Sequence, residues 1–262
     1  MTFKDQLQRT IQLESTPRRI VSLVPSQTEL LVDLGLEARL VGVTKFCVHP
    51  KHLCISKPVV GGTKQVHFDK IKALNPDIIL CNKEENTKEM IAEIEAIAPV
   101  HISDIYNLED TFSLITMYGE LFSVAASAED LIADIQVERE AFQLQYKTED
   151  QLKAAYFIWK KPWMVAASDN FIDVMLNEAG FSNAFQQEER YPEIDLEHSA
   201  LQAADVIFLS SEPFPFKPSD IDTFQLKFPK KSVKIVDGEM FSWYGSRLIK
   251  AYTYFKSLHL KA

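Results

Sequence analysis

The sequence predicts an α/β protein made of two similar lobes with parallel sheets, joined by one long helix. Three observations lead to this prediction. Strand and helix patterns alternate in both halves of the 262-residue chain, which is the usual order of a parallel sheet covered by helices. One segment of the chain occurs twice. The stretch between about residues 108 and 147 has no strand pattern.

The repeated segment reads as a helix turn, a break, an aspartate and an apolar strand. Its two copies, Phe68–Leu80 and Leu196–Phe208, align without a gap, so that Asp77 falls on Asp205. A second similarity follows each copy at a slightly larger offset, between Val100–Asp104 and Val233–Asp237. Two copies at such a wide spacing indicate two related units, whereas a solenoid needs three or more short repeats. Two such lobes are expected to enclose a cleft, the common type of ligand site.

In the first half, the strands and helices alternate from Arg19 onward. Arg19–Val24 is a β-branched, apolar run and predicts a buried parallel strand. Ser26–Glu29 matches a capping box, so a helix is expected to start there and to end at Gly35. Leu40–Thr44 predicts the second strand. The next elements are a helix and strand ending at Leu80, a helix over Glu84–Ile97, and a strand over Val100–Ser103.

The second half starts after a helix that joins the lobes. Ser127–Asp130 is a helix start, and the apolar residues that follow it partly keep a 3.6-residue period. We therefore expect an N-terminal lobe over residues 1–125, a bridging helix over 126–148 and a C-terminal lobe over 149–262. In that lobe the expected elements are a strand over Ala154–Trp159 and a helix capped by Ser168 or Asp169 and closed by a left-handed Gly180.

Composition excludes several classes of protein. The net charge of −9 argues against nucleic-acid binding, which normally needs a basic surface. No apolar run reaches the roughly 18 residues of a membrane span. No signal peptide is visible, so these features alone indicate the cytoplasm. Three cysteines, an odd number, indicate reduced thiols. No nucleophile elbow, zinc-protease or C-x-x-C motif occurs, so we expect no catalytic residue, no cofactor and no enzyme activity.

Ligands of parallel α/β lobes bind outside the carboxyl ends of the strands. Six segments that follow predicted strands are rich in polar and aromatic residues: 25–27, 45–49, 82–86, 160–163, 210–216 and 238–247. The aromatic residues of the second half's loops are Trp159, Trp163, Tyr191, Phe214, Phe216, Phe241, Trp243 and Tyr244. Rings in loops favour contact with a large, partly apolar ligand. The alternative is that they only pack the loops onto the lobe.

Cys47–Cys54 contains four potential soft-metal ligands in eight residues. Their order, C-x-H-x2-H-x-C, is atypical of zinc sites, which usually pair C-x2-C with a distant second pair. We therefore expect Cys47 and His49 to contact a ligand rather than to hold a metal by themselves.

Several of these segments carry a family resemblance. They are Arg19–Ser26 with Glu29–Leu31, the turn Gly61–Gly62, and Asn75–Leu80. Together they resemble the substrate-binding proteins of ATP-driven cobalamin and iron-chelate importers, and above all the periplasmic cobalamin-binding proteins, over about residues 18–259. The resemblance implies two Rossmann-like lobes bridged by a single rigid helix, a ligand in the cleft between them, no catalysis, and a periplasmic or cell-surface location.

In that family, one acidic residue on each lobe docks against arginines of the membrane permease. The matching positions are Asp69 and Glu197, which are also equivalent by the internal repeat. A pseudo-twofold protein that docks on a twofold permease needs matching charges. The alternative is that both acids serve the dipoles of nearby helices.

We predict a monomeric, non-enzymatic solute-binding protein that captures a corrinoid or a metal chelate for an ABC importer. The alternatives are a cytoplasmic carrier or sensor without a permease, and a chelate-modifying enzyme. The predicted ligand-binding residues are Cys47, His49, Lys64, Lys83, Trp163, Tyr191, Glu212, Glu239, Phe241, Trp243 and Arg247. A metal held by His49, Glu84, Glu212 and Glu239 is a further alternative.

Overall fold

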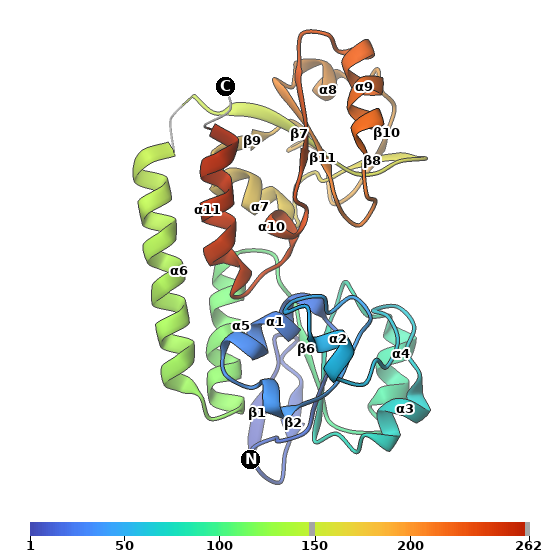
Figure 1. Ribbon diagram of the computed structural model, residues 1–262, viewed down its shortest axis with the longest axis vertical. Helices are drawn as coiled ribbons and strands as arrows, with labels where there is room; N and C mark the ends of the chain where they lie inside the picture. The colour runs from blue at the N-terminus through green and yellow to red at the C-terminus, as the bar shows by residue number, and fades with distance from the viewer. Residues whose placement is uncertain (147–149, 260–262) are drawn as a thin grey trace. The chain divides into compact units, whose positions relative to one another are not determined.

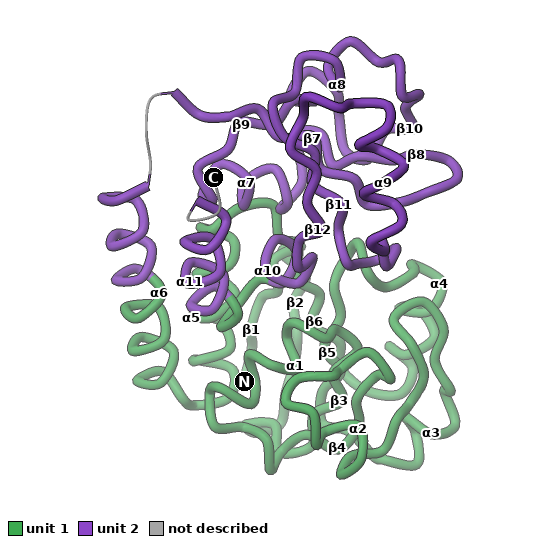
Figure 2. Tube along the Cα trace, turned by 45° about the horizontal axis from the view of Figure 1, so that its top comes forward, with its two compact units in different colours: residues 1–135, 244–247 green, residues 136–243, 248–262 purple. Residues whose placement is uncertain are grey.

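The structure is a computed structural model that describes residues 1–146 and 150–259. The chain forms two compact units, residues 1–135 with 244–247 and residues 136–243 with 248–262 (Figure 2). The division falls within helix α6 (Ala125–Tyr146), in the region where the sequence predicts the bridging helix. The expected helix end at 148 and lobe start at 149 lie outside the described residues. Among those described, no helix is both long and apolar enough to cross a bilayer.

Unit 1 is built on a parallel sheet with the strand order β4-β3-β5-β6 (Figure 2). Its strands are β3 (Ile20–Ser22), β4 (Leu40–Val43), β5 (Ile78–Asn82) and β6 (Val100–Ser103). Its helices are α1 (Pro25–Asp33), the 3-10 turn η1 (Glu37–Arg39), α2 (Leu53–Ser56), α3 (Phe68–Ala73), α4 (Lys88–Ile94) and α5 (Leu108–Leu121) (Figure 1). Apolar residues of α3 and α4 pack with Val21, Ile79 and Ile102 into one core. A hairpin of β1 (Thr2–Lys4) and β2 (Thr10–Gln12) precedes the sheet.

Unit 2 contains a related sheet, in which β9, β7, β11 and β12 run parallel. Its strands are β7 (Leu152–Trp159), β8 (Trp163–Val165), β9 (Phe181–Asn183), β10 (Glu193–Ile194), β11 (Val206–Ser210) and β12 (Ser232–Val236). Its helices are α7 (Phe171–Glu178), α8 (Ser199–Ala203), α9 (Pro218–Lys227), α10 (Glu239–Ser242) and α11 (Arg247–His259). Antiparallel β8 and β10 extend this sheet and were not predicted. The predicted fold class, two α/β lobes with parallel sheets, is confirmed.

The internal repeat corresponds to equivalent strands in the two sheets. When the two copies are aligned as the sequence predicts, β5 and β11 start and end at matching positions. Ile79 of β5 pairs with Val100 of β6, and Ile207 of β11 pairs with Val233 of β12. The second similarity therefore reflects a shared strand register. The two units have the same parallel core.

The repeated aspartate explains part of this similarity. Asp77 accepts hydrogen bonds through Oδ2 from the amides of Arg18 at 2.7 Å and Arg19 at 2.9 Å. Asp205 accepts one from the amide of Lys153 at 2.8 Å, also through Oδ2. In both units the aspartate's own amide donates back to the neighbouring chain, to Arg19 O or Lys153 O, at 2.8 Å. Each aspartate therefore fixes the start of its strand against the adjacent strand of the sheet.

The predicted capping box at Ser26 is wrong. Helix α1 starts one residue earlier, at Pro25, with Val24 as N-cap and no side-chain cap. Proline suits the first helical position because its missing N–H would have no partner there. The Glu29 side chain instead accepts a hydrogen bond from Arg247 Nε at 2.7 Å, and both side chains are buried.

Two other predicted helix starts move for similar reasons. Thr87, not Glu84, caps α4 by accepting from the Met90 amide at 3.2 Å. Asn82 Oδ1 accepts from the amides of residues 84 and 85, which holds that stretch in a turn. Asn170, rather than Ser168 or Asp169, caps α7. The left-handed Gly180 is confirmed, with a φ of +82°.

The stretch before the bridging helix contains an element that the sequence pattern did not separate. Helix α5 starts at Leu108, where Asn107 and Asp110 form a capping box. Helix α6 then starts at Ala125. The predicted single long helix is therefore preceded by a second helix, which belongs to unit 1.

The outer edge of β6 is covered by side chains from the N-terminal hairpin. Arg9 Nη2 donates to Val100 O at 2.9 Å, and Asp5 Oδ2 accepts from the Ile102 amide at 3.3 Å. Gln6 Oε1 accepts from the Asp104 amide at 3.0 Å. These side chains occupy backbone positions that a further strand would otherwise use, which prevents edge-to-edge pairing.

His101 of β6 is a buried histidine without a hydrogen-bond partner at either ring nitrogen. It is 1% exposed and lies edge-on to the ring of Tyr118, with centroids 5.3 Å apart. Burial, with a smaller contribution from Arg9, lowers the pKa of His101 from 6.5 to about 4. The unfolded chain therefore binds this proton between pH 6.5 and 4 while the folded chain does not.

We predict that the free energy of unfolding falls by about 3 kcal/mol from this group as the pH drops from 6.5 to 4. Urea titrations of the wild type and of His101→Leu across that range measure the effect, because the other titrating groups cancel in the difference. The variant should become more stable relative to the wild type at low pH. A difference that stays constant with pH would show that His101 does not titrate in this way.

The buried Glu29–Arg247 pair gives a second prediction. Removing one partner strands a buried charge, so Glu29→Leu and Arg247→Met should each cost about 3–5 kcal/mol of unfolding free energy. The double variant should be closer to the wild type than either single variant, since it buries no charge. Denaturant unfolding of all four proteins measures the coupling. Additive losses would mean that the two side chains do not act as a pair.

Candidate functional site

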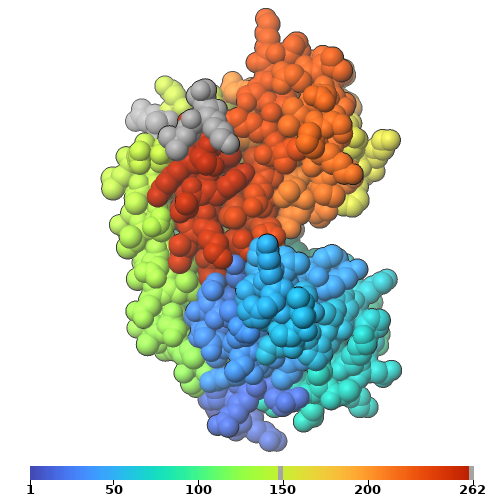
Figure 3. All heavy atoms as spheres, in the orientation of Figure 1, coloured from blue at the N-terminus to red at the C-terminus, as the bar shows by residue number. Residues whose placement is uncertain are grey.

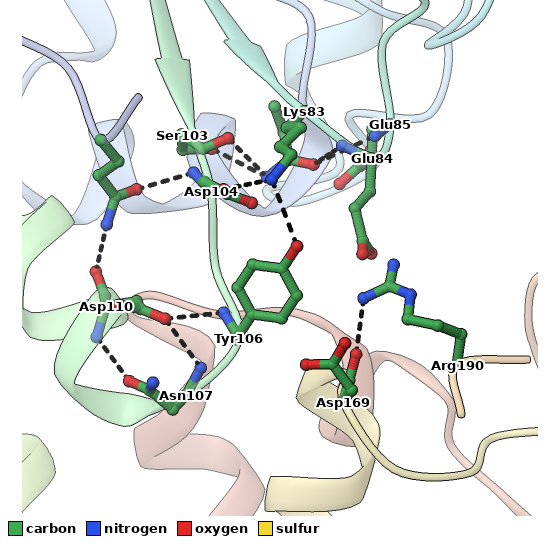
Figure 4. A network of polar contacts seen from close by, with 12 residues as sticks. Lys83, Glu84, Glu85, Ser103, Asp104, Tyr106, Asn107, Asp110, Asp169 and Arg190 are labelled. Atoms are coloured by element: carbon green, nitrogen blue, oxygen red, sulfur yellow. Dashed lines mark hydrogen bonds and ion pairs between the residues drawn. The ribbon is translucent and has the colours of Figure 1, made fainter. Parts of the chain in front are cut away.

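At the carboxyl end of the unit 1 sheet, Lys83 follows β5 and Asp104 follows β6 (Figure 4). Lys83 Nζ donates to Asp104 Oδ2 at 2.6 Å and to Tyr106 OH at 3.3 Å. These hydrogen bonds raise the pKa of Lys83. The ammonium group is half-exposed and already paired, so a ligand carboxylate or phosphate would have to share it with Asp104.

Other polar side chains lie at the same carboxyl end of the unit 1 sheet. Lys64 Nζ donates to Glu84 O at 2.5 Å and links the glycine turn to the segment after β5. His49 is half-buried in the loop after β4. His49, Lys64 and Lys83 are thus accessible, and His49 and Lys83 follow strands of unit 1.

In the Cys47–Cys54 loop, Cys47 is not placed where it could contact a ligand, whereas the sequence predicts that it does. Cys47 is fully buried, and its Sγ lies 3.1 Å from Thr28 Oγ1 and 3.2 Å from Thr44 Oγ1. Burial raises the pKa of Cys47, which makes it a poor nucleophile and a poor metal ligand. Cys54 Sγ donates to Cys47 O at 3.2 Å. All three cysteines are free thiols, as predicted.

Two of the exposed residues of this loop are apolar. Phe46 is 48% exposed and Val48 is 41% exposed. Lys45 Nζ lies 4.9 Å from the centre of the Phe46 ring. The segment around residue 50, light blue in Figure 3, lies on the visible surface of unit 1. The residue predicted from the sequence is Cys47, which points into the core, and not its exposed neighbour Phe46.

At the carboxyl end of the unit 2 sheet, Trp159 and Phe214 form what we call the aromatic surface. Trp159 ends β7 and is 39% exposed, and Phe214 is half-buried in the loop after β11. Their rings meet edge-to-face with centroids 5.6 Å apart. Phe214 rests on Phe216 at 4.9 Å, and Phe216 stacks on Trp163 at 6.3 Å. Trp163 is thus the inner support of this surface.

Both outer rings are among the loop aromatics of the second half, but neither is a predicted ligand contact. Trp163 is predicted instead, and it packs mainly on Phe157 and Phe224. The signal that separates these residues is their distance from the end of the strand. Trp159 is the last residue of β7, whereas Trp163 starts β8 and turns back onto the sheet.

Tyr191 lies in the segment before β10. The Arg190 guanidinium is 5.4 Å from the centre of its ring, and Arg190 Nη1 donates to Asp169 O at 2.6 Å (Figure 4). Tyr191 is half-buried, so an amphipathic ring with a hydroxyl group remains accessible there.

Glu212 and its neighbours follow β11 and β12. Glu212 Oε1 accepts hydrogen bonds from Ser242 Oγ at 2.7 Å and Trp243 Nε1 at 3.0 Å. Burial raises the pKa of Glu212, and the charges of Glu239 and Asp237 add to that rise, while the two hydrogen bonds oppose it. Glu239 starts α10 and is half-buried.

The remaining predicted ligand residues are in cores. Phe241 is fully buried and packs on Tyr156 and Phe255, with centroids 5.1 and 5.0 Å away. Trp243 is buried. Arg247 is buried and paired with Glu29 within unit 1. We therefore leave Cys47, Phe241, Trp243 and Arg247 out of the proposed ligand contacts.

No group of three or more His, Cys, Asp or Glu side chains within residues 1–146 and 150–259 is arranged to hold a metal ion. We therefore propose no metal site at His49, Glu84, Glu212 and Glu239. A surface pocket of about 400 Å³ lies at the other end of the unit 1 sheet, between residues 9–12 and 95–100. It contains none of the predicted ligand residues.

The two predicted docking acids are both exposed, in different local settings. Asp69 lies in the first turn of α3. The Glu197 side chain is 77% exposed and lies just before α8, where it forms an ion pair with Lys227. Only Asp69 fits the alternative of an acid that serves a helix dipole.

Comparison with known proteins places this architecture in a family. A family model described as periplasmic binding protein matches residues 20–230. An uncharacterized ABC transporter substrate-binding lipoprotein of Bacillus subtilis (strain 168) is 27% identical over 193 residues, covering 70% of this chain and 60% of that protein. A vitamin B12-binding protein of Vibrio campbellii (strain ATCC BAA-1116) is 24% identical over 195 residues, covering 74% of this chain and 70% of that protein.

A solved structure gives the same fold. A possible iron-binding (periplasmic solute-binding) protein from Staphylococcus epidermidis ATCC 12228 superposes with a TM-score of 0.80 at 19% identity, covering 94% of this chain and 100% of that chain. At that identity the likeness concerns the fold alone. The family model, by contrast, matches most of the sequence, and the chain therefore belongs to the periplasmic binding protein family.

Proposed function

We propose that this protein is a non-enzymatic solute-binding protein that captures a corrinoid or a metal chelate for an ABC importer. The observation that carries the proposal is the aromatic surface, two rings left partly exposed where β7 and β11 end. A folded protein gains stability by burying such rings, so leaving them accessible at the expected ligand position favours a binding role.

The relatives support the ligand class. One is named a vitamin B12-binding protein, and another is named an ABC transporter substrate-binding lipoprotein. Corrinoids and metal chelates are large, with apolar faces and polar edges. A partly apolar site with a few polar anchors suits such a molecule.

The proposed contacts combine both kinds of group. Trp159 and Phe214 would pack on apolar parts of the ligand. Polar edges of the ligand would meet a smaller set of side chains. From the sequence prediction we retain His49, Lys64, Lys83, Tyr191 and Glu239 for this role, with Trp163 as support.

Ligand binding is testable with three probes: cyanocobalamin, haemin and a ferric hydroxamate siderophore. We expect at least one to bind with a dissociation constant below about 100 μM. Trp159→Ala and Phe214→Ala should each weaken that binding about tenfold, because each removes a stacking ring. Absorbance and tryptophan-quenching titrations measure the affinities.

A matched control is Leu226→Ala, which removes an exposed apolar side chain of α9 and should leave affinity unchanged. If the wild type binds none of the three probes, the proposed ligand class is wrong. If the probes bind and the two ring variants match the control, the ligand does not use the aromatic surface.

We further propose that Asp69 and Glu197 dock against a permease. Their equivalence by the internal repeat and their exposure support this role. Complementary charges of this kind steer association and orient the partners.

Charge reversal tests the docking proposal. Asp69→Lys and Glu197→Lys should reduce cellular uptake of the ligand at least tenfold while leaving its affinity within about twofold, since neither residue follows a strand at the ligand end. Glu140→Lys on α6 is the exposed control. Normal uptake by both variants, or a parallel loss of ligand affinity, would contradict the docking role.

A further inference from the structure

We propose that Glu212 is a positioning residue, whose carboxylate ties the loop after β11 to helix α10 and thereby holds Phe214 in the aromatic surface. This inference rests on the proposed function, because it concerns the site for the same ligand. It replaces the sequence prediction that Glu212 contacts the ligand directly.

The hydrogen bonds of Glu212 join two separate segments of unit 2. Its Oε1 accepts from Ser242 Oγ of α10 at 2.7 Å and from Trp243 Nε1, just after α10, at 3.0 Å. The backbone on the loop side is also held, because Ser210 Oγ donates to Glu212 O at 2.6 Å. One side chain therefore links the end of β11 to the helix that follows β12.

Close packing at Gly238 shows how tightly these segments approach. A Cβ atom at this position would lie 2.4 Å from Ser210 Oγ and 2.6 Å from Glu212 Cγ. The Gly238 amide donates to Ser211 Oγ at 2.9 Å. Only glycine fits in this space, so the start of α10 is in direct contact with the loop that Glu212 holds.

The same loop carries the outer ring of the aromatic surface. Phe214 is two residues beyond Glu212, and its amide donates to Ile158 O at 3.4 Å, next to Trp159. This backbone contact is long, and residues 213 and 215 are prolines without amide donors. The Glu212 side chain adds two shorter hydrogen bonds, with Ser242 and Trp243, next to this weakly held part of the loop.

A direct ligand contact and a positioning role predict different effects of a conservative change. Glutamine keeps an Oε1 atom that can accept both hydrogen bonds but carries no charge. If Glu212 holds the loop, Glu212→Gln should preserve ligand affinity. If Glu212 is instead a charged contact of the ligand, Glu212→Gln should lose as much ligand affinity as Glu212→Ala.

The experiment uses the full chain and two readouts. With the tightest-binding of cyanocobalamin, haemin and the siderophore, Glu212→Ala should lose about tenfold in affinity, whereas Glu212→Gln should stay within about twofold of the wild type. Without ligand, hydrogen exchange at the amides of Glu212 and Phe214 should be about tenfold faster in the alanine variant only. Glu140→Ala, on the exposed side of α6, is the control for loss of an acidic side chain.

Each outcome decides between the alternatives. Equal losses in the glutamine and alanine variants, or alanine binding and exchange equal to the wild type, would overturn the positioning role. The exchange measurement needs no ligand, so it judges this inference even if none of the three probes binds. In that case the proposed ligand class fails separately.

Discussion

A buried polar network in unit 1 is the constraint on which much of the described architecture depends. Gln27 of α1 donates to Ser103 Oγ of β6 at 2.6 Å and to Tyr244 OH at 2.9 Å, and it accepts from Tyr118 OH of α5 at 2.6 Å. Every one of these side chains is buried, so each bond replaces a lost bond to water. Together with Glu29 and Arg247, the network fixes residues 244–247 within unit 1.

That anchoring has a topological result. The chain leaves unit 1 within α6, returns for residues 244–247, and leaves again into α11. Helix α10 and Trp243, which hold the Glu212 side chain, come directly before this returning segment. Residues 244–247 themselves belong to unit 1, so replacing Arg247 concerns the core of that unit.

The sequence predicts most of the parallel core because its signals are local. A β-branched run such as Ile20–Ser22 and a strand preceded by an aspartate, as at Asp77 and Asp205, are visible without the fold. The first residues of the helices were harder to predict. Ser26 matches a capping box, but it is buried and follows a proline that already starts the helix. The short antiparallel strands β8 and β10 have no strong pattern and depend on pairing with β7.

For the candidate site, the sequence predicts which residues follow strands better than it predicts which way their side chains point. Cys47, Phe241 and Arg247 follow strands as expected, yet each side chain points into a core, and only packing determines that. The positioning role that we propose for Glu212 could not be predicted, since its partners Ser242 and Trp243 are about 30 residues away in sequence. Chain position shows where a group lies, but the direction of its side chain depends on contacts distant in sequence.

The N-terminal hairpin carries a consequence for the integrity of the sheet. Asp5, Gln6 and Arg9 satisfy the backbone of β6 in the way a fifth strand would, without offering a new free edge of their own at those positions. A chain lacking this hairpin would keep every residue of the parallel core. The backbone N–H and C=O groups at the outer edge of β6 would then have no partner and would face solvent. Self-association through strand addition would then be favoured, so the first dozen residues protect the chain against aggregation.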